Sequence, residues 1–343
     1  MARLVEAQRA AGDVPYVLAG EVAHTGVRRV LDLWDPHARR LVRDRAAAVG
    51  ADVIHLHNVV RELSPSVVGA AGSLPVVMTV HDLRLFGNGE HHLPDPRAAA
   101  DWLVLGPLTR REIRRHVSAV VAVSEPVAEM VRSAGLAVAR VVPVPVPPPM
   151  VEPRPVEACW NIVLAATLAR DKGAHVLLAA FAQVVGRHPA ARLVLAGSGP
   201  EEGALRDAAK PLGDRVQLVG RLGAAGVSAA LGSARVVVVP SLPGLRREGS
   251  SLSAAEGARH GRPVITSDDP AVAEVARAVG GDVVPAGNVV ALAERLDYWL
   301  AAPALAAAAG ARAAALAADR FDVTSVAASV RGVYEDVIAG RSR

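Results

Sequence analysis

Aromatic residues and cysteine are both scarce in this chain of 343 residues. Aromatic side chains make up 3% of it, and alanine and valine take their place. The single cysteine, Cys159, excludes an internal disulfide framework and favours a reducing compartment. The chain has no run of eighteen apolar residues, and its amino-terminal stretch is charged throughout, unlike a signal peptide. We therefore expect a cytoplasmic protein.

The chain also lacks a strong excess of charge of one sign. Its formal net charge is +4, and 51% of its residues are hydrophobic, a balance typical of a globular protein. No motif combines basic and aromatic residues for nucleic acid, so we expect no nucleic-acid partner. A modest basic surface could attract an anionic lipid head group or a phosphate-bearing substrate, but the plain interpretation is an ordinary solvated surface.

A proline-rich stretch near the middle of the chain marks a domain boundary. Seven prolines lie between Pro143 and Pro155, which excludes a helix or a central strand there. Such a segment forms an extended, semi-rigid connector. A chain of this length is expected to contain two domains.

Short apolar runs alternate with helical stretches on both sides of this connector. The expected strands lie within residues 15–20, 51–58, 74–82, 117–125, 160–167, 191–199, 215–220, 234–240, 262–267 and 281–287. Buried runs that alternate with helices indicate parallel sheets covered on both faces. We expect an α/β fold of two doubly wound, Rossmann-like domains. Ligands of such folds bind beyond the carboxyl ends of the strands, often in a cleft between domains.

Two glutamates, Glu248 and Glu256, flank a glycine-serine turn that follows the expected strand 234–240. The turn therefore lies on the ligand side of the second sheet. Ser253 and Glu256 fit the S-x-x-E capping box at a helix start. The free amides of such a start form an anion site suited to phosphate. Gly261 then ends the helix.

The two carboxylates suit hydroxyl groups better than a metal ion. Glu248 lies in the loop and Glu256 about two turns into the helix, too far apart for a compact metal pair. A carboxylate accepts two hydrogen bonds from a vicinal diol, as in a sugar or a ribose. The alternative is that Glu256 caps its own helix and that Glu248 is solvated. Two histidine pairs, His55/His57 and His91/His92, invite a metal interpretation. His55 and His57 share one face of a strand and have no acidic or cysteine companion nearby, and we expect no metal site.

The E-x7-E pattern after "VVVVPS", followed by "G-x-P-V-I", resembles the retaining GT-B glycosyltransferases of family 4 (glycosyl transferases group 1). Other segments resemble the family in the expected order, namely "ADVIHLHN", "VVMTVHD", "VVAVSE", "TLARDKG", "ARLVLAGSGPEE" and "VQLVGRL". The resemblance covers about residues 50–340 and, weakly, the first fifty. It implies an acceptor domain at 1–149, a nucleotide-sugar donor domain at 150–320 and a final helix, 321–343, that returns to the first domain.

The resemblance implies a role for each residue of the second-domain site. Glu256 would hold the ribose hydroxyls of the donor and Glu248 those of the transferred sugar. The amides of Ser251 and Leu252 would bind the distal phosphate. Gly249, Ser250 and Thr167 complete the expected donor-binding set.

Two further residues would act on the leaving group and the sugar. Lys172 would place its positive charge next to the diphosphate leaving group, and His81, in the first domain, would face the sugar. The family needs neither a metal nor a cofactor besides the nucleotide-sugar. Retention is thought to proceed by same-face attack, so neither glutamate is assigned a covalent role.

The sequence departs from the family pattern in three places. Ala166 and Thr167 replace the glycine and arginine of G-R-L, and we hypothesise that Arg170, Arg246 or Arg247 compensates. The proline run replaces the usual asparagine-glycine turn. The family's first strand and glycine-rich turn are missing, and we favour a start internal to a longer reading frame over a naturally shortened, impaired chain.

The sequence thus predicts a retaining glycosyltransferase that acts on a natural-product, glycan or lipid-linked acceptor. Arginines within 27–45 and 109–116 suggest a peripheral membrane contact. The sequence leaves the nucleotide base, the sugar, the acceptor and the oligomeric state open. Alternatives are a non-catalytic GT-B partner protein, a nucleotide-sugar epimerase, or a dinucleotide-dependent oxidoreductase. The last rests on Gly197, Gly199 and Gly203, but Glu201 and Glu202 would repel a pyrophosphate at that helix start.

Overall fold

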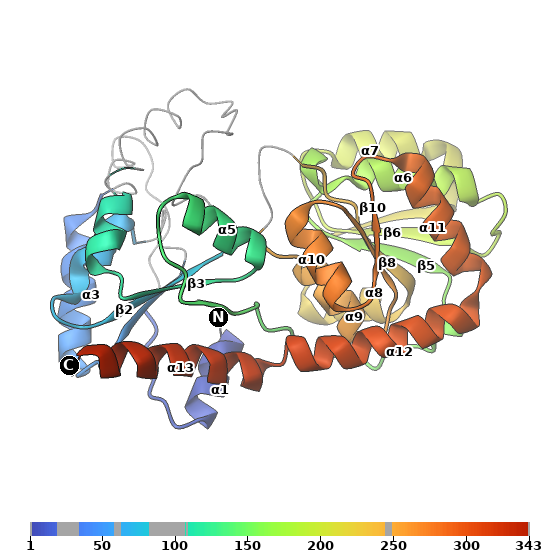
Figure 1. Cartoon of the computed structure of the whole chain (residues 1–343). Coiled ribbons are helices and arrows are strands. Elements are labelled where there is room, and N and C mark those ends of the chain that lie inside the picture. The colour runs from blue at the N-terminus through green and yellow to red at the C-terminus, as the bar shows by residue number, and fades with distance from the viewer. Residues whose placement is uncertain are drawn as a thin grey trace. The chain divides into compact units, whose positions relative to one another are not determined.

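The computed structural model describes residues 2–18, 34–57, 63–81, 107, 109–243 and 249–341 of the chain. They form two compact units, each around its own parallel sheet (Figure 1). Unit 1 comprises residues 1–143 and 323–343, and unit 2 comprises residues 144–322. The sequence analysis placed these divisions after residues 149 and 320 instead. The prediction of two α/β domains with parallel sheets is confirmed.

The described residues of unit 1 form a four-stranded parallel sheet in the order β1-β2-β3-β4. The strands are β1 (Ile54–His57), β2 (Val76–Val80), β3 (Ala119–Ala122) and β4 (Arg140–Val141). Every residue of β2 and β3 is buried, which explains their continuous apolar runs. The sequence analysis missed β4. This two-residue strand lies at the sheet edge and ends before Pro143, as the missing N–H of proline requires.

Helices of unit 1 surround this sheet. They are α1 (Ala2–Ala10), α3 (Pro36–Ala48), α5 (Glu125–Ser133), α13 (Val323–Arg341), the 3₁₀ helix η2 (Pro65–Ala71) and helical residues 109–116. The Asp35 and Ser124 side chains cap α3 and α5. Helix α13 packs on α1 and β2, and it contributes Val326 and Val330 to the core around Val77. The end of the chain therefore completes the core of unit 1.

The strand predicted within residues 15–20 is absent over residues 13–18, and residues 19 and 20 lie outside the described ranges. Val14 is 97% exposed, and Tyr16 and Val17 are more than half exposed. None of the described strands runs beside this segment. A strand without a hydrogen-bonded neighbour leaves its backbone to water, so an apolar run alone does not make one.

Unit 2 has a six-stranded parallel sheet in the order β10-β9-β8-β5-β6-β7. The strands are β5 (Asn161–Ala165), β6 (Arg192–Ala196), β7 (Val216–Gly220), β8 (Ala234–Val239), β9 (Val264–Ser267) and β10 (Asp282–Val284). Each lies within a range expected from the sequence. All six residues of β8 are buried because β5 and β9 flank it and helices cover both faces.

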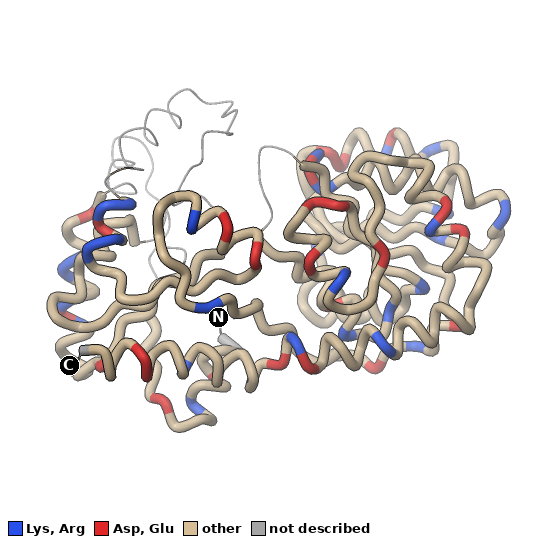
Figure 2. Tube along the Cα trace, viewed as in Figure 1, with Lys and Arg blue, Asp and Glu red and all other residues tan. Residues whose placement is uncertain are grey.

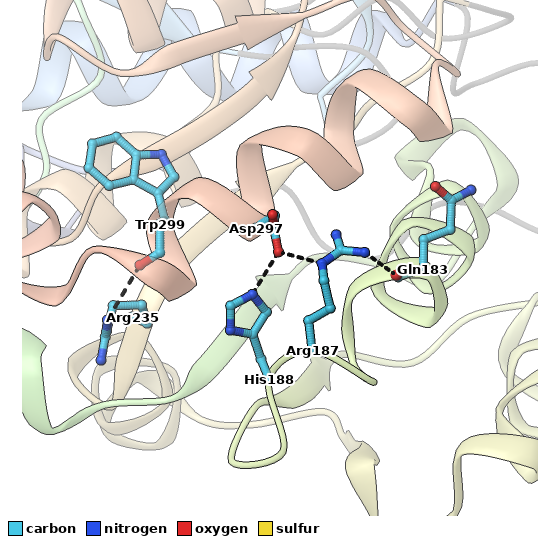
Figure 3. Close-up of polar contacts among 6 residues, drawn as sticks. All are labelled: Gln183, Arg187, His188, Arg235, Asp297 and Trp299. Atoms are coloured by element: carbon cyan, nitrogen blue, oxygen red, sulfur yellow. Dashed lines mark hydrogen bonds and ion pairs between the residues drawn. The ribbon is translucent and has the colours of Figure 1, made fainter.

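Seven α-helices in the described part of unit 2 cover the sheet. They are α6 (Ala174–Val184), α7 (Glu202–Ala209), α8 (Ala224–Gly232), α9 (Leu252–Arg259), α10 (Pro270–Ala278), α11 (Val289–Ala301) and α12 (Pro303–Arg320). Beyond the end of α6, Arg187 and His188 both bond the Asp297 carboxylate of α11, at 3.0 and 2.7 Å (Figure 3). Both bonds lower the pKa of Asp297. These contacts fasten α6 to α11.

The proline-rich connector is anchored on unit 2. The Val146 N–H donates to the Phe321 carbonyl at 3.0 Å, and the N–H groups of Met150 and Val151 donate to Ser228 Oγ. One 3₁₀ turn, η4 (Val156–Ala158), interrupts the otherwise extended segment, in which the sequence analysis expected no helix. Short 3₁₀ turns need few backbone donors, so prolines nearby permit them.

We also asked whether the chain contains a membrane-spanning helix. Among the described residues, no single helix combines the length and apolarity that crossing a membrane requires. Val289–Ala301 and Pro303–Gly340 meet those criteria only as a pair, which is bent by 103° at the break.

Candidate functional site

The loop after β5, residues 166–173, is held against the turn after β6. The Ala166 and Leu168 N–H groups donate to the carbonyls of Ala196 and Ser198 at 3.0 and 3.1 Å. A Cβ added at Gly197 would lie 1.8 Å from the Ala166 carbonyl oxygen, and one at Gly199 would lie 2.4 Å from that of Leu168. Only glycine permits so close an approach.

These contacts bear on the oxidoreductase alternative. Gly197 and Gly199 are needed for contact with the neighbouring loop, and around Gly203 the described structure has no atom within 4 Å of an added Cβ. The glycine spacing therefore has an explanation that involves no dinucleotide. This weakens the cofactor interpretation of these three residues.

A second glycine contact places Lys172 at the carboxyl end of β8. The 3₁₀ turn η5 (Arg170–Lys172) ends at Gly173, which is left-handed at φ +69°. A Cβ at Gly173 would lie 1.9 Å from the Pro240 carbonyl oxygen, and the Leu242 N–H donates to the Asp171 carbonyl at 2.7 Å. The half-buried Lys172 is thus fixed beside the segment that follows β8.

Helix α9 begins at Leu252, and its cap differs from the predicted one. Ser251, not Ser253, is the N-cap, and its hydroxyl accepts from the Ala254 N–H at 3.3 Å. The Ser253 hydroxyl instead donates to the Ala165 carbonyl at 2.5 Å, at the end of β5. The predicted capping box is therefore wrong. Gly261, left-handed at φ +71°, follows the helix end as expected.

The Ser253 bond brings the start of α9 to the same sheet edge as the Lys172 turn. Glu256 is the fifth residue of α9, about one turn in rather than two, and is half-buried. At the helix start, Ser251 is buried and Leu252 is 46% exposed. Gly249 and Ser250 are half-buried just before it.

Some of the remaining predicted site residues of unit 2 lie within the residues that the structure describes, and others lie outside them. Thr167 is exposed in the loop after β5. Arg170 is exposed as well, and its guanidinium lies 3.9 Å from the Glu201 carboxylate. Glu248, Arg246 and Arg247 lie outside the described residues, so their predicted roles stay predictions.

Sequence reasoning did not single out His175, the second residue of α6. Burial lowers its pKa, Arg170 lowers it further, and Glu201 opposes both. His175 therefore favours the neutral form near the predicted phosphate site. The feature of the sequence that could have identified His175 is its position two residues after Gly173.

In unit 1, three histidines line up across the ends of β1 and β2. The rings of His55 and His57 lie 4.1 Å apart between centroids, and those of His57 and His81 lie 5.3 Å apart. His57 Nδ1 and His81 Nε2 share a hydrogen bond of 2.9 Å. The predicted site residue His81 thus has a histidine partner that the sequence analysis had considered only as a metal ligand.

Burial decides the charge of the two inner histidines. Burial, aided by His81, lowers the pKa of His55 to about 3. Burial, aided by His55 and His81, lowers that of His57 to about 2. His55 bonds the Tyr334 hydroxyl on α13 at 2.5 Å and Thr79 at 2.7 Å. Both histidines are neutral at neutral pH, and the described residues contain no cluster suited to a metal ion.

Family models match both halves of the chain. Residues 160–302 match "Glycosyl transferases group 1", and residues 3–148 match "Glycosyltransferase Family 4". The chain belongs to the GT-B glycosyltransferases. One family model covers most of unit 1 and the other covers most of unit 2, in agreement with the two sheets.

Curated relatives of this GT-B glycosyltransferase include mannosyltransferases. It is 35% identical over 176 residues to a phosphatidyl-myo-inositol mannosyltransferase of Mycobacterium leprae, which covers 50% of this chain and 45% of the relative. It is 32% identical over 160 residues to a GDP-mannose-dependent monoacylated alpha-(1-6)-phosphatidylinositol monomannoside mannosyltransferase of Corynebacterium glutamicum, which covers 46% of this chain and 41% of the relative. The matched part spans less than half the length of these relatives.

Solved structures share its fold over most of the chain. Sucrose-phosphate synthase from Thermosynechococcus elongatus superposes with a TM-score of 0.76 at 22% identity, covering 98% of this chain and 92% of that one. Anabaena Alr3699/HepE in complex with UDP superposes with a TM-score of 0.70 at 19% identity, covering 87% and 82%. At these identities the likeness shows the fold.

Proposed function

We propose that this GT-B glycosyltransferase transfers a sugar from a nucleoside-diphosphate donor with retention of anomeric configuration. One observation carries the proposal: in unit 2, the start of α9 and the turn that bears Lys172 meet at the carboxyl ends of β5 and β8. The Ser253–Ala165 bond and the Gly173–Pro240 contact hold them there. Helix amides and an ammonium group together suit a diphosphate.

The same groups account for catalysis of bond cleavage. When the bond from the anomeric carbon to the diphosphate breaks, negative charge grows on the departing oxygen. The Lys172 ammonium and the amides at the start of α9 would stabilise this added charge, so they would bind the transition state more strongly than the donor, whose diphosphate carries less negative charge. This is the task that a metal ion performs in other transferases, so we propose that no metal is required.

Carboxylates and a histidine would hold the sugars. Glu256 is proposed to accept hydrogen bonds from the ribose hydroxyls, and Glu248 from the transferred sugar. His81 of unit 1 is proposed to meet the sugar as well. No side chain is assigned as a nucleophile, because retention by same-face attack needs none.

The names of the relatives suggest the donor and the acceptor. We propose GDP-mannose as the first donor to test and a lipid-linked acceptor with an anionic head group. Basic residues on α3 and at 109–116 support the latter (Figure 2); Arg40, Arg43, Arg111, Arg114 and Arg115 are exposed there. Salt-sensitive sedimentation with anionic vesicles is expected, and binding that salt does not weaken would contradict this contact. We propose that the reaction takes place in the cytoplasm.

The experiment that tests the donor site is a thermal-shift panel with UDP, GDP, ADP and NAD. A ligand that binds the folded state alone raises its melting midpoint by mass action. One nucleoside diphosphate is expected to stabilise the wild type, and Glu256→Gln and Lys172→Gln are expected to weaken that response. Glu294→Gln, on the exposed face of α11 in the same unit, is the matched control.

The outcomes separate the alternatives. Stabilisation by NAD but by no diphosphate would favour the oxidoreductase. A chain that binds a diphosphate but neither hydrolyses nor transfers its sugar would favour the non-catalytic partner. If a diphosphate raises the melting midpoint equally in wild type and Glu256→Gln, the ribose does not bind Glu256 of α9.

A further inference from the structure

A cavity of about 440 Å³ opens at the amino-terminal edge of the unit 2 sheet. β5 and β6 begin there, at Asn161 and Arg192, whereas the proposed donor site lies at the opposite, carboxyl edge. The described residues that line it are Arg154, Ala158, Cys159, Trp160, Asn161, Ala190, Arg192, Gln217 and Ser233. This set contains two arginines and no carboxylate. Its volume is in the range of small-molecule sites.

Of the two arginines that line this cavity, Arg192 has an unpaired side-chain atom. The Nη1 atom of Arg192 is buried and has no hydrogen-bond partner in the described part of the chain. Leaving a buried charged donor unpaired is costly, and native structures rarely do so without a ligand or water. Arg154 lies exposed on the rim, and its guanidinium carries a second positive charge.

Two further arginines lie behind the cavity wall. Arg235 and Arg262 are 0% and 1% exposed, and both donate to backbone carbonyls, among them Cys159, Glu157 and Gly232. Burial lowers the pKa of both, and the Arg154 charge lowers that of Arg262 further, whereas Glu157 opposes these effects. Cys159, which lines the cavity, also opposes the lowering of both pKa values, so the two buried guanidinium groups stay positively charged behind the wall.

Trp160 adds an aromatic surface to this positive wall. Its indole is 39% exposed, and the Arg235 guanidinium lies 4.9 Å from the ring centroid. The cation occupies one side of the ring, and the exposed part of the ring remains for a ligand. Gln217 is exposed at the same cavity and offers an amide.

We propose that this cavity binds a small phosphate-bearing molecule, with its phosphate between Arg154 and Arg192 and its organic part against Trp160. The proposal is independent of sugar transfer, because the site lies on the other edge of the sheet. A phosphate would pair with the Arg192 side chain, which lines the cavity. It would also neutralise the repulsion between Arg154 and Arg262.

Tryptophan fluorescence tests the proposal, with inorganic phosphate and pyrophosphate as probes at constant ionic strength. A saturable change is expected in the wild type and in Lys172→Gln, which disables the proposed donor site. Arg192→Gln is expected to lower the affinity about tenfold or more, the loss of about one charged hydrogen bond. Trp160→Phe is expected to lose most of the signal but to keep the thermal stabilisation by phosphate.

Arg206→Gln serves as the matched control, because Arg206 is an exposed arginine of α7 paired with Glu202. It is expected to bind as the wild type does. If Arg192→Gln does not fold, Arg192→Lys, which keeps the charge without the fork, is expected to bind more weakly. A response that is unsaturable, equal in Arg192→Gln and wild type, or abolished by Lys172→Gln would overturn the proposal.

Discussion

The Nδ1 atom of His57 lies 2.9 Å from the Nε2 atom of His81, across the neighbouring strands β1 and β2. Because its pKa is about 2, His57 stays neutral at neutral pH and carries one ring proton. His57 therefore holds Nε2 of His81 in a hydrogen bond, and this bond fixes the orientation of the His81 ring. A residue proposed to face the sugar is thus held by a buried neighbour.

Replacing His57 tests this relationship. His57→Phe is expected to lower kcat about tenfold to a hundredfold with little change in the donor KM, because the ring of His81 loses its hydrogen bond. His57→Asn places an amide near the former Nδ1 and is expected to retain most of the activity. Steady-state kinetics on the donor found in the thermal-shift panel measures both.

His188→Asn, in unit 2, is the control for histidine loss and is expected to leave kcat unchanged. If His57→Phe and His57→Asn lose activity equally, His57 fills space rather than orienting His81. The proton-bearing nitrogen of His81, read from ¹⁵N-coupled histidine NMR spectra, reports the same contact without an activity assay. An unchanged spectrum in His57→Phe would contradict the positioning role.

Acid is expected to destabilise unit 1 through His55 and His57. Their folded pKa values, about 3 and about 2, lie below the unfolded value of 6.5, so below pH 6.5 the unfolded chain binds more protons. The free energy of unfolding should then fall by up to about 1.4 kcal/mol per pH unit for each histidine, and should not change on their account above pH 6.5. Urea unfolding at a series of pH values measures the slope.

His55→Gln keeps a polar side chain that does not titrate. In this variant the free energy of unfolding is expected to fall less steeply with acid, by about 1.4 kcal/mol per pH unit, which corresponds to one bound proton. An identical slope in this variant and in the wild type would show that other groups dominate acid unfolding. Urea unfolding of His188→Gln, whose histidine pairs with Asp297, controls for histidine loss elsewhere.

Gly173→Ala is expected to destabilise unit 2 and to abolish the nucleotide response. The left-handed backbone alone costs about 1–2 kcal/mol, and the Cβ would overlap the Pro240 carbonyl oxygen. The turn that bears Lys172 must then move away from β8. Chemical denaturation and the thermal-shift panel measure the two effects.

Gly203→Ala is the matched control, because Gly203 lies in α7 and its added Cβ would have no described atom within 4 Å apart from its chain neighbours and the backbone of its own helix. This variant should be neutral or up to about 1 kcal/mol more stable, since alanine favours the helix. Comparable losses in both variants would argue against the Gly173–Pro240 contact.

Ser228→Ala is expected to cost about 1–3 kcal/mol of stability. The Ser228 hydroxyl accepts from the N–H groups of Met150 and Val151 and bonds His260 Nε2 at 2.8 Å. Both connector amides would lose their acceptor. Thermal unfolding measures the change, and Ser329→Ala, whose hydroxyl donates to the Ser325 carbonyl of the same helix α13, should have an effect near zero. A near-zero effect at Ser228 would show that water replaces the hydroxyl.

The sequence by itself determined both sheets, the positions of their long strands and the helix after β8. Its strongest signals were local, since the apolar run of β8 and the left-handed Gly261 each restrict the backbone within a few residues. Lys172 was identified through the resemblance of "TLARDKG" to the family pattern, and Glu256 through the E-x7-E pattern.

Tertiary structure decided which groups meet. Ser251 caps α9 because Ser253 is taken by the Ala165 carbonyl, 88 residues away. Tyr334 reaches His55 across 279 residues, and Gly197 is required by the Ala166 carbonyl of another loop. Residues 15–18 form no strand because none of the described strands lies beside them. Local patterns record what a segment prefers, but a hydrogen bond or a close contact needs a partner that only the folded chain supplies.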